Sequence, residues 1–261
     1  MMNFFFGLNN SYISCKLTIP KFNNNSKYTN YNVYSAKPKN NEWILNKVDC
    51  DQNENFYFIE NSLIKNDSIY FLADEKEIEK TSYMNINEFA KKNNFTNTLP
   101  SAFRANLKIY SSSGGFSSYQ SEYPYSMTTK TGNILSPIDI LLNKYADKNL
   151  IFFRNIYYLP NEDESNIFFV NIKTKKILKV QKIRNNYSNE LQIDNNLIEK
   201  NVYIFSDFAL GIPLYISIKN NHISFEHTHP PHHYILSENK FNIVGKLKEQ
   251  IKEVINESYK K

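Results

Sequence analysis

Short apolar segments separated by Asn-rich turns run through most of the chain. In the first third, such segments lie at residues 12–19, 31–36, 43–48, 56–59 and 69–72. The side chains of Cys15, Leu17 and Ile19 recur at every second position, which is the period of a strand with one buried face. This pattern predicts antiparallel strands at the spacing of a sandwich.

The same pattern returns in the second part of the chain. Further strands are predicted at 103–110, 150–158, 167–172, 177–183 and 202–205. A last hairpin is predicted over 212–218 and 222–229, with its turn at Asn220 and Asn221, because two adjacent asparagines tolerate positive φ angles. On its return strand, alternate residues from Ile223 to His229 share one face of the sheet.

Helical periodicity is confined to a few segments. Ser136 followed by Pro137 is typical of a helix start, and it predicts a short helix between strands. Another short helix is predicted at 86–94. Ser237 precedes a long C-terminal helix at 238–257, whose apolar stripe predicts packing against a sheet.

The predicted fold is therefore mainly β. We expect one or two sandwich-like or barrel-like antiparallel modules, with a short internal helix and a long C-terminal helix. The polar, Pro-containing segment at 95–101 favours a boundary between a module at 1–98 and a module at 103–261, although one domain would also fit. No internal repeat of constant period is found.

Composition indicates a folded protein with no strong bias toward a polyanionic partner. Aromatic residues make up 15% of the 261 residues, with 19 Tyr and 19 Phe, too many large rings for a disordered chain. The net charge is +5, but lysines and glutamates mix along the sequence. We therefore expect no nucleic-acid partner.

The N-terminal segment and the lack of a long apolar run predict a cytoplasmic protein. The Phe4–Phe6 run follows no basic residue and precedes no cleavage site of small residues, which argues against a signal peptide. No apolar run is long enough for a membrane span. Cys15 and Cys50 show no CxxC pattern and could form a single bridge, but in a cytoplasmic protein reduced thiols are the default expectation.

A histidine cluster near the C-terminus is the strongest candidate for chemistry. Four of the five histidines lie close together, at His227, His229, His232 and His233. Residues at i and i+2 on a strand project to the same side, so His227 and His229 can converge on one ion. Either His232 or His233 would supply a third nitrogen for one divalent metal, zinc or iron.

Part of this cluster is similar to a known zinc motif. In the sequence, His227-Thr228-His229-Pro230 is followed after a spacer by Ser237, an order that resembles the motif of the JAMM metalloproteases. The resemblance implies zinc ligation by the two histidines. However, Lys240 stands where that family has its metal-binding aspartate, and the long β-rich region upstream does not resemble the compact α/β domain of that family.

A segment rich in serine, glycine and tyrosine at 111–125 is the second candidate. The rings of Tyr119, Tyr123 and Tyr125 would stack on sugar faces, with Arg104 as a further ligand-binding residue. Gln120 and Glu122 would orient a substrate or move a proton. No GxxxxGK[ST] pattern occurs, so no nucleotide cofactor is expected. Arg154 alternates with large apolar residues and is expected on the solvent face of a strand; the alternative is that it points inward and binds an anion.

Two functions of different classes follow from these candidates. The first is a metal-dependent enzyme, either a hydrolase or an oxygenase, that uses the histidine cluster, with Gln120 and Glu122 as catalytic residues. The alternative is a non-catalytic module that binds glycans, another small molecule or a protein through the segment at 111–125. Metal content of the purified protein separates the two hypotheses.

Overall fold

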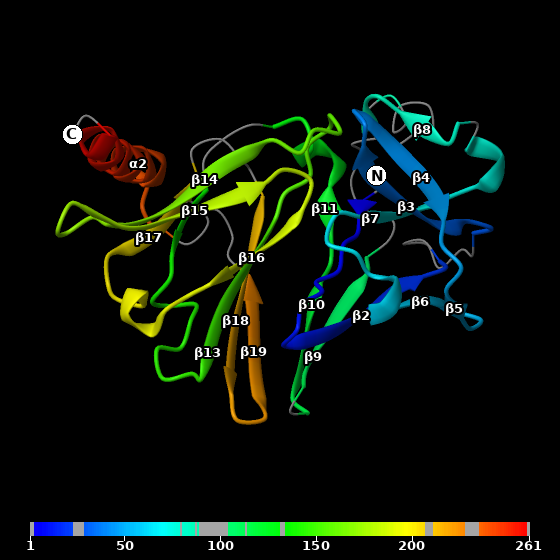
Figure 1. The fold of residues 1–261 in the computed structure, drawn as a ribbon, viewed down its shortest axis with the longest axis horizontal. Coiled ribbons are helices and arrows are strands. Elements are labelled where there is room, and N and C mark those ends of the chain that lie inside the picture. Colours follow the sequence, from blue (N-terminus) through cyan, green and yellow to red (C-terminus); the bar gives the residue numbers. More distant parts are fainter. Residues whose placement is uncertain are drawn as a thin grey trace.

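The chain folds into four antiparallel sheets of four or five strands, arranged as a four-bladed propeller, with an additional two-stranded sheet and a C-terminal helix (Figure 1). The computed structural model describes residues 3–22, 29–78, 80–86, 88, 104–112, 114–130, 134–206, 211–227 and 235–259. The mainly β character is confirmed, but the predicted sandwich or barrel is wrong. The physical difference is that the strands divide among four narrow sheets instead of forming two broad sheets or one closed sheet.

The first half of the chain builds two of the sheets. The β2 sheet has the order β10-β9-β2-β6-β5, the β3 sheet has the order β7-β3-β4-β8, and β1 pairs with β11. The elements are β1 (Asn3–Phe4), β2 (Ile13–Pro20), β3 (Asn32–Lys39), β4 (Glu42–Lys47), β5 (Asp51–Gln52), β6 (Phe56–Glu60), η1 (Asn61–Leu63), β7 (Ile69–Ala73), η2 (Glu75–Glu77), β8 (Ser82–Tyr83), β9 (Asn106–Ser111), β10 (Phe116–Gln120), β11 (Tyr123–Pro124) and η3 (Tyr125–Met127).

The second half builds the other two sheets and the helix. The β13 sheet has the order β16-β13-β18-β19, and the β14 sheet has the order β12-β17-β14-β15. The elements are β12 (Leu135–Pro137), β13 (Lys148–Arg154), β14 (Glu164–Asn171), β15 (Lys176–Arg184), β16 (Ser188–Gln192), η4 (Asn195–Leu197), β17 (Val202–Ser206), β18 (Ile212–Lys219), β19 (His222–His227) and α2 (Lys240–Tyr259).

The two halves repeat one order of strand pairing. In the first half, β2 pairs with β6 and β9, β9 pairs with β10, and the hairpin β3–β4 pairs with β7. In the second half, β13 pairs with β16 and β18, β18 pairs with β19, and the hairpin β14–β15 pairs with β17. The segment that precedes each half follows the same rule. In the first half Phe5 forms a bridge to β7, and in the second half β12 pairs with the corresponding strand β17. The chain therefore contains a duplicated topology.

The β2 sheet continues across the predicted boundary between residues 98 and 103. Strand β9 lies after this point in the sequence, yet it pairs with β2 over the register Ile13–Ser111 to Thr18–Asn106. Residues 89–103 themselves, which include most of the helix predicted at 86–94, lie outside the described part of the chain.

Strand β13 joins the cores of the two halves. Its side chains alternate, so that Leu150 and Phe152 pack into the core of the first half. Ile151 and Phe153 pack on the opposite face, into the core between the β13 and β14 sheets. Both faces of this strand are buried, which is why its sequence is a continuous apolar run rather than an alternating one.

The short helix predicted after Ser136 is wrong, because Leu135–Pro137 forms strand β12 beside β17. The hydroxyl of Ser136 is fully buried and accepts a hydrogen bond of 2.6 Å from the hydroxyl of Tyr215. Ser136 is therefore a core residue rather than a helix cap. Ile138 and Leu142 follow it into the core without forming a helix.

The two C-terminal predictions are confirmed. Lys219 pairs with His222 across the predicted hairpin turn, and α2 packs Val244, Ile251 and Val254 on the outer face of the β14 sheet. The stripe is shorter than expected, because Phe241 is 66% exposed. In the described part of the chain, no helix has the length and apolar character that a membrane crossing requires.

Candidate functional site

Edge strands of the two halves meet at a place that we name the seam, defined by Tyr119 on β10 and Phe225 and His227 on β19. The ring of Tyr119 lies 5.7 Å from that of Phe225 and 4.6 Å from that of His227. The neighbouring hairpin turns also touch, since a Cβ on Gly115 would lie 1.9 Å from the carbonyl oxygen of Asn221. A glycine is required there for close backbone approach. The seam thus joins two candidate segments that are far apart in the sequence.

A half-buried carboxylate lies beside the seam. One oxygen of Glu122, Oε1, has no hydrogen-bond partner in the described part of the chain, and the Nε atom of Arg104 lies 3.7 Å from it. Loss of solvent raises the pKa of Glu122, although Arg104 opposes this. Burial, assisted by the charge of Glu122, also raises the pKa of Tyr119 to about 12. This carboxylate is therefore held in an environment that disfavours its charge.

Replacement of Glu122 by Gln is expected to stabilise the protein at neutral pH. A carboxyl whose pKa is raised by folding contributes stability below its unfolded pKa, and this contribution is lost as the pH rises through the folded pKa. The thermal midpoint of the variant should therefore exceed that of the wild type at pH 7, and the difference should vanish below pH ~4. Glu249→Gln, at an exposed position on α2, is the control. A pH-independent difference would contradict the assigned cause.

Of the histidine cluster, only His227 falls in the described residues, where it ends β19. His229, His232 and His233 lie outside them. Within the described part, no group of three or more His, Cys, Asp or Glu side chains is placed to hold an ion. Metal binding by zinc or iron, and an enzyme that depends on it, therefore stay predictions.

The other predicted ligand-binding tyrosines lie away from the seam surface. Tyr123 is fully buried and pairs with Phe4 between β11 and β1. Burial raises its pKa to about 12. Tyr125 begins η3 and packs against the core of the first half. By contrast, Arg104 and Gln120 lie together, with Nη1 of Arg104 donating to Oε1 of Gln120 at 3.5 Å.

Strand β10 presents different side chains on its two sides. Tyr119 points toward the core, whereas Phe116, Ser118 and Gln120 point to the outer side of the β2 sheet. We name this outer side the lysine–aromatic face. Its members are Phe116, Ser118 and Gln120 of β10, Asn106, Lys108 and Tyr110 of β9, Ser14, Lys16 and Thr18 of β2, and Phe58 and Glu60 of β6.

Rings and ammonium groups alternate on the lysine–aromatic face. The Nζ atom of Lys108 lies 3.9 Å from the ring centroid of Phe116 and 5.1 Å from that of Tyr110. The Nζ atom of Lys16 lies 4.5 Å from the ring centroid of Phe58. Phe116 is 62% exposed. In the sequence, the period-two spacing of aromatic and polar residues in 106–110 and 116–120 indicates part of this face. The whole face could not be predicted in this way, because its residues come from four strands.

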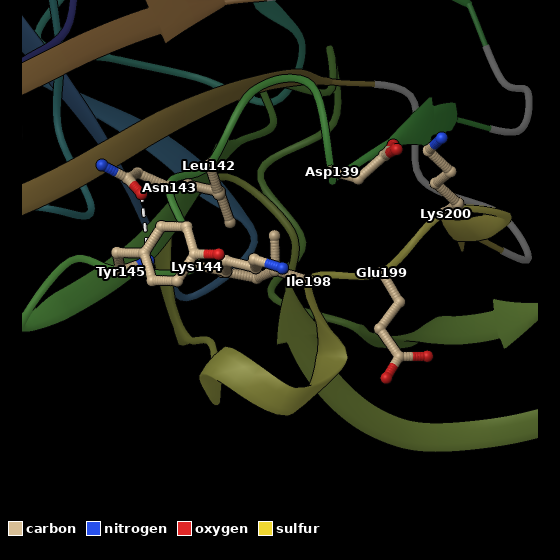
Figure 2. Close-up of a pocket in the computed structure, with 8 residues that line it drawn as sticks. All are labelled: Asp139, Leu142, Asn143, Lys144, Tyr145, Ile198, Glu199 and Lys200. Atoms are coloured by element: carbon tan, nitrogen blue, oxygen red, sulfur yellow. Dashed lines mark hydrogen bonds between the residues drawn. The ribbon is translucent and has the colours of Figure 1, made fainter.

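A separate hollow of about 510 Å³ lies in the second half of the chain. Figure 2 shows its lining, in which the carboxylates of Asp139 and Glu199 point in different directions and the main chain of Tyr145 donates to the side chain of Asn143. A ligand site needs polar groups that converge on one point. This hollow lacks that arrangement, so the seam and the lysine–aromatic face remain the better candidates.

Arg154 lies inside the protein, so its predicted place on a solvent face is wrong. It is fully buried at the end of β13, and Nη1 donates to the carbonyl oxygen of Asn66 at 2.5 Å and to Ser188 Oγ at 3.2 Å. Its Nε and Nη2 atoms have no hydrogen-bond partner among the described residues. Burial lowers its pKa to about 10. The guanidinium links the two halves.

Comparisons of this chain with family models, with curated proteins and with solved structures found no match. The function therefore has to be argued from the side chains themselves.

Proposed function

We propose that this chain is a saccharide-binding protein whose ligand lies on the lysine–aromatic face. The observation that carries the proposal is the exposed ring of Phe116, 62% accessible, with Tyr110 beside it at a centroid distance of 6.4 Å. Exposed rings on a sheet supply flat apolar surfaces for the C–H faces of sugar rings.

Polar groups surround these rings and suit a hydroxyl-rich ligand. Ser118, Gln120 and Asn106 are exposed on the same face, and their hydroxyl and amide groups can both donate and accept hydrogen bonds. The centre of a protein–protein interface is depleted in lysine and glutamate, whereas here Lys108 and Lys16 are central. The composition of the face therefore favours a saccharide over a protein partner.

Phe116→Ala is expected to weaken saccharide binding roughly tenfold, because a stacked ring contributes about 0.5–1.5 kcal/mol beyond its buried area. A glycan array would first identify a ligand, and titration calorimetry would then compare the variant with the wild type. Phe241→Ala removes a ring of similar exposure on α2 and serves as the control. The proposal fails if no saccharide binds, or if both variants bind like the wild type.

A further inference from the structure

The central row of the lysine–aromatic face runs across four strands in the order Ser118, Lys108, Lys16 and Glu60. Lys108 and Lys16 are direct cross-strand partners on β9 and β2. Side chains at directly opposite positions have Cβ atoms about 4.5–5.5 Å apart, and two like charges in such a pair destabilise the sheet. The row therefore holds a repulsive pair at its centre.

Only one of these two charges is compensated. The Nζ atom of Lys16 lies 2.6 Å from Oε1 of Glu60, on the neighbouring strand β6. Lys108 forms no ion pair with any carboxylate in the described part of the chain. A ligand anion beside Lys108 would relieve the repulsion and supply the missing countercharge.

Aromatic rings hold the ammonium group of Lys108 in place. It lies between Phe116 and Tyr110, at 3.9 and 5.1 Å from their centroids. Cation–π attraction of this kind restricts a side chain that would otherwise move freely. A restricted donor loses less entropy when it binds an anion, so the site is organised before the ligand arrives. The same rings would stack on the sugar that carries the anion.

The charge balance of the face favours widely spaced anions. Glu60 ends the central row, and Glu122 lies at the corner with Arg104. A nucleic acid brings one phosphate for every nucleotide along its strand, so some phosphates would lie against these carboxylates. A saccharide with one acidic group per disaccharide carries fewer charges along its length, and it offers hydroxyls to the remaining polar side chains.

We infer that the ligand is an acidic saccharide, a chain of carboxylated or sulfated sugars, with one acidic group held beside Lys108 and Lys16 while its ring stacks on Phe116 and Tyr110. This inference rests on the proposed function and deepens it. It requires binding that depends on the charge of the ligand as well as on its shape.

A panel of oligosaccharides tests the inference on the full chain. Hexamers of galacturonate, alginate, hyaluronan and heparin are compared with neutral forms of the same hexamers, in which the carboxyl groups are reduced and, for heparin, the sulfates are also removed. A single-stranded thymidine oligonucleotide of equal charge is included. We expect at least one acidic hexamer to bind about tenfold more tightly than its neutral form, because a hydrogen bond to a charged group is stronger than one to a neutral group. Its affinity should fall as salt rises.

Lys108→Met identifies the group responsible, since it keeps the apolar stem and removes the charge. It should abolish the preference for the acidic hexamer, so that the acidic and neutral hexamers bind the variant with equal affinity. Lys246→Met on α2 is the control. Circular dichroism and the thermal midpoint establish that both variants are folded.

The outcomes separate this inference from the proposed function. If neutral hexamers bind as tightly as acidic ones and Phe116→Ala weakens both, the inference is overturned while saccharide binding stands. If no hexamer binds, both the inference and the proposed saccharide binding are overturned. Tighter binding of the oligonucleotide than of every hexamer would also overturn the inference and would assign the face to single-stranded nucleic acid.

Discussion

Phe152→Ala is expected to lower the free energy of unfolding by about 3–5 kcal/mol, the usual range for removal of a fully buried phenyl ring. Phe152 lies at the centre of β13 and is 0% exposed. Its ring belongs to the core of the first half, although its strand belongs to the second. The substitution therefore opens a cavity at the place where the two halves join.

Urea denaturation followed by tyrosine fluorescence and by circular dichroism measures this loss. Phe241→Ala is the matched control, since its ring is 66% exposed and the change should stay within about 0.5 kcal/mol. If the two halves unfold as one unit, both probes will shift together. A change below about 1 kcal/mol would contradict the assignment of Phe152 to a shared core.

Arg154→Ala is expected to cost about 3 kcal/mol, whereas Arg154→Met should cost less than about 1 kcal/mol. The alanine leaves a cavity in the interior. The methionine fills most of it and removes a charged group whose Nε and Nη2 atoms lack a hydrogen-bond partner within the described residues. Replacing a buried charge by an apolar side chain of similar shape is often neutral or stabilising.

The groups that Arg154 contacts keep other partners in both variants. The carbonyl oxygen of Asn66 also accepts from the main-chain nitrogen of Ser188 at 2.8 Å, and Ser188 Oγ also donates to the carbonyl oxygen of Gly7 at 3.3 Å. Thermal and urea unfolding of both variants checks the prediction. An equal loss of unfolding free energy in the alanine and methionine variants would contradict our interpretation. It would show that the charge of Arg154 itself stabilises the contact between the two halves.

Local sequence patterns predicted strands well, because each strand has a buried face or lies wholly in the core. Cys15, Leu17 and Ile19 are all buried, as their period-two spacing indicated. The same local signals failed at Ser136, where a sequence typical of a helix start lies in the interior and hydrogen-bonds to Tyr215. A capping signal cannot compete with burial that only distant strands create.

The candidate site shows the same division. The sequence singled out Tyr119, Gln120, Glu122 and Arg104 in one region and His227 in another, and the structure places Tyr119 against His227. It did not single out Lys16, Lys108 or Phe58, because these residues come from separate strands and have ordinary neighbours in the chain. Their proximity depends on strand register, which short-range patterns do not specify.

By itself, the sequence determined that this protein is mainly β, where most of its strands lie and that a long helix follows them, since these properties depend on side-chain periodicity within a few residues. Only the tertiary structure decided that the strands form four sheets, that two halves repeat one pairing order, and that lysines and rings share a face. Those properties arise from hydrogen-bonded pairing between distant segments, and loops of different length conceal them in the linear chain.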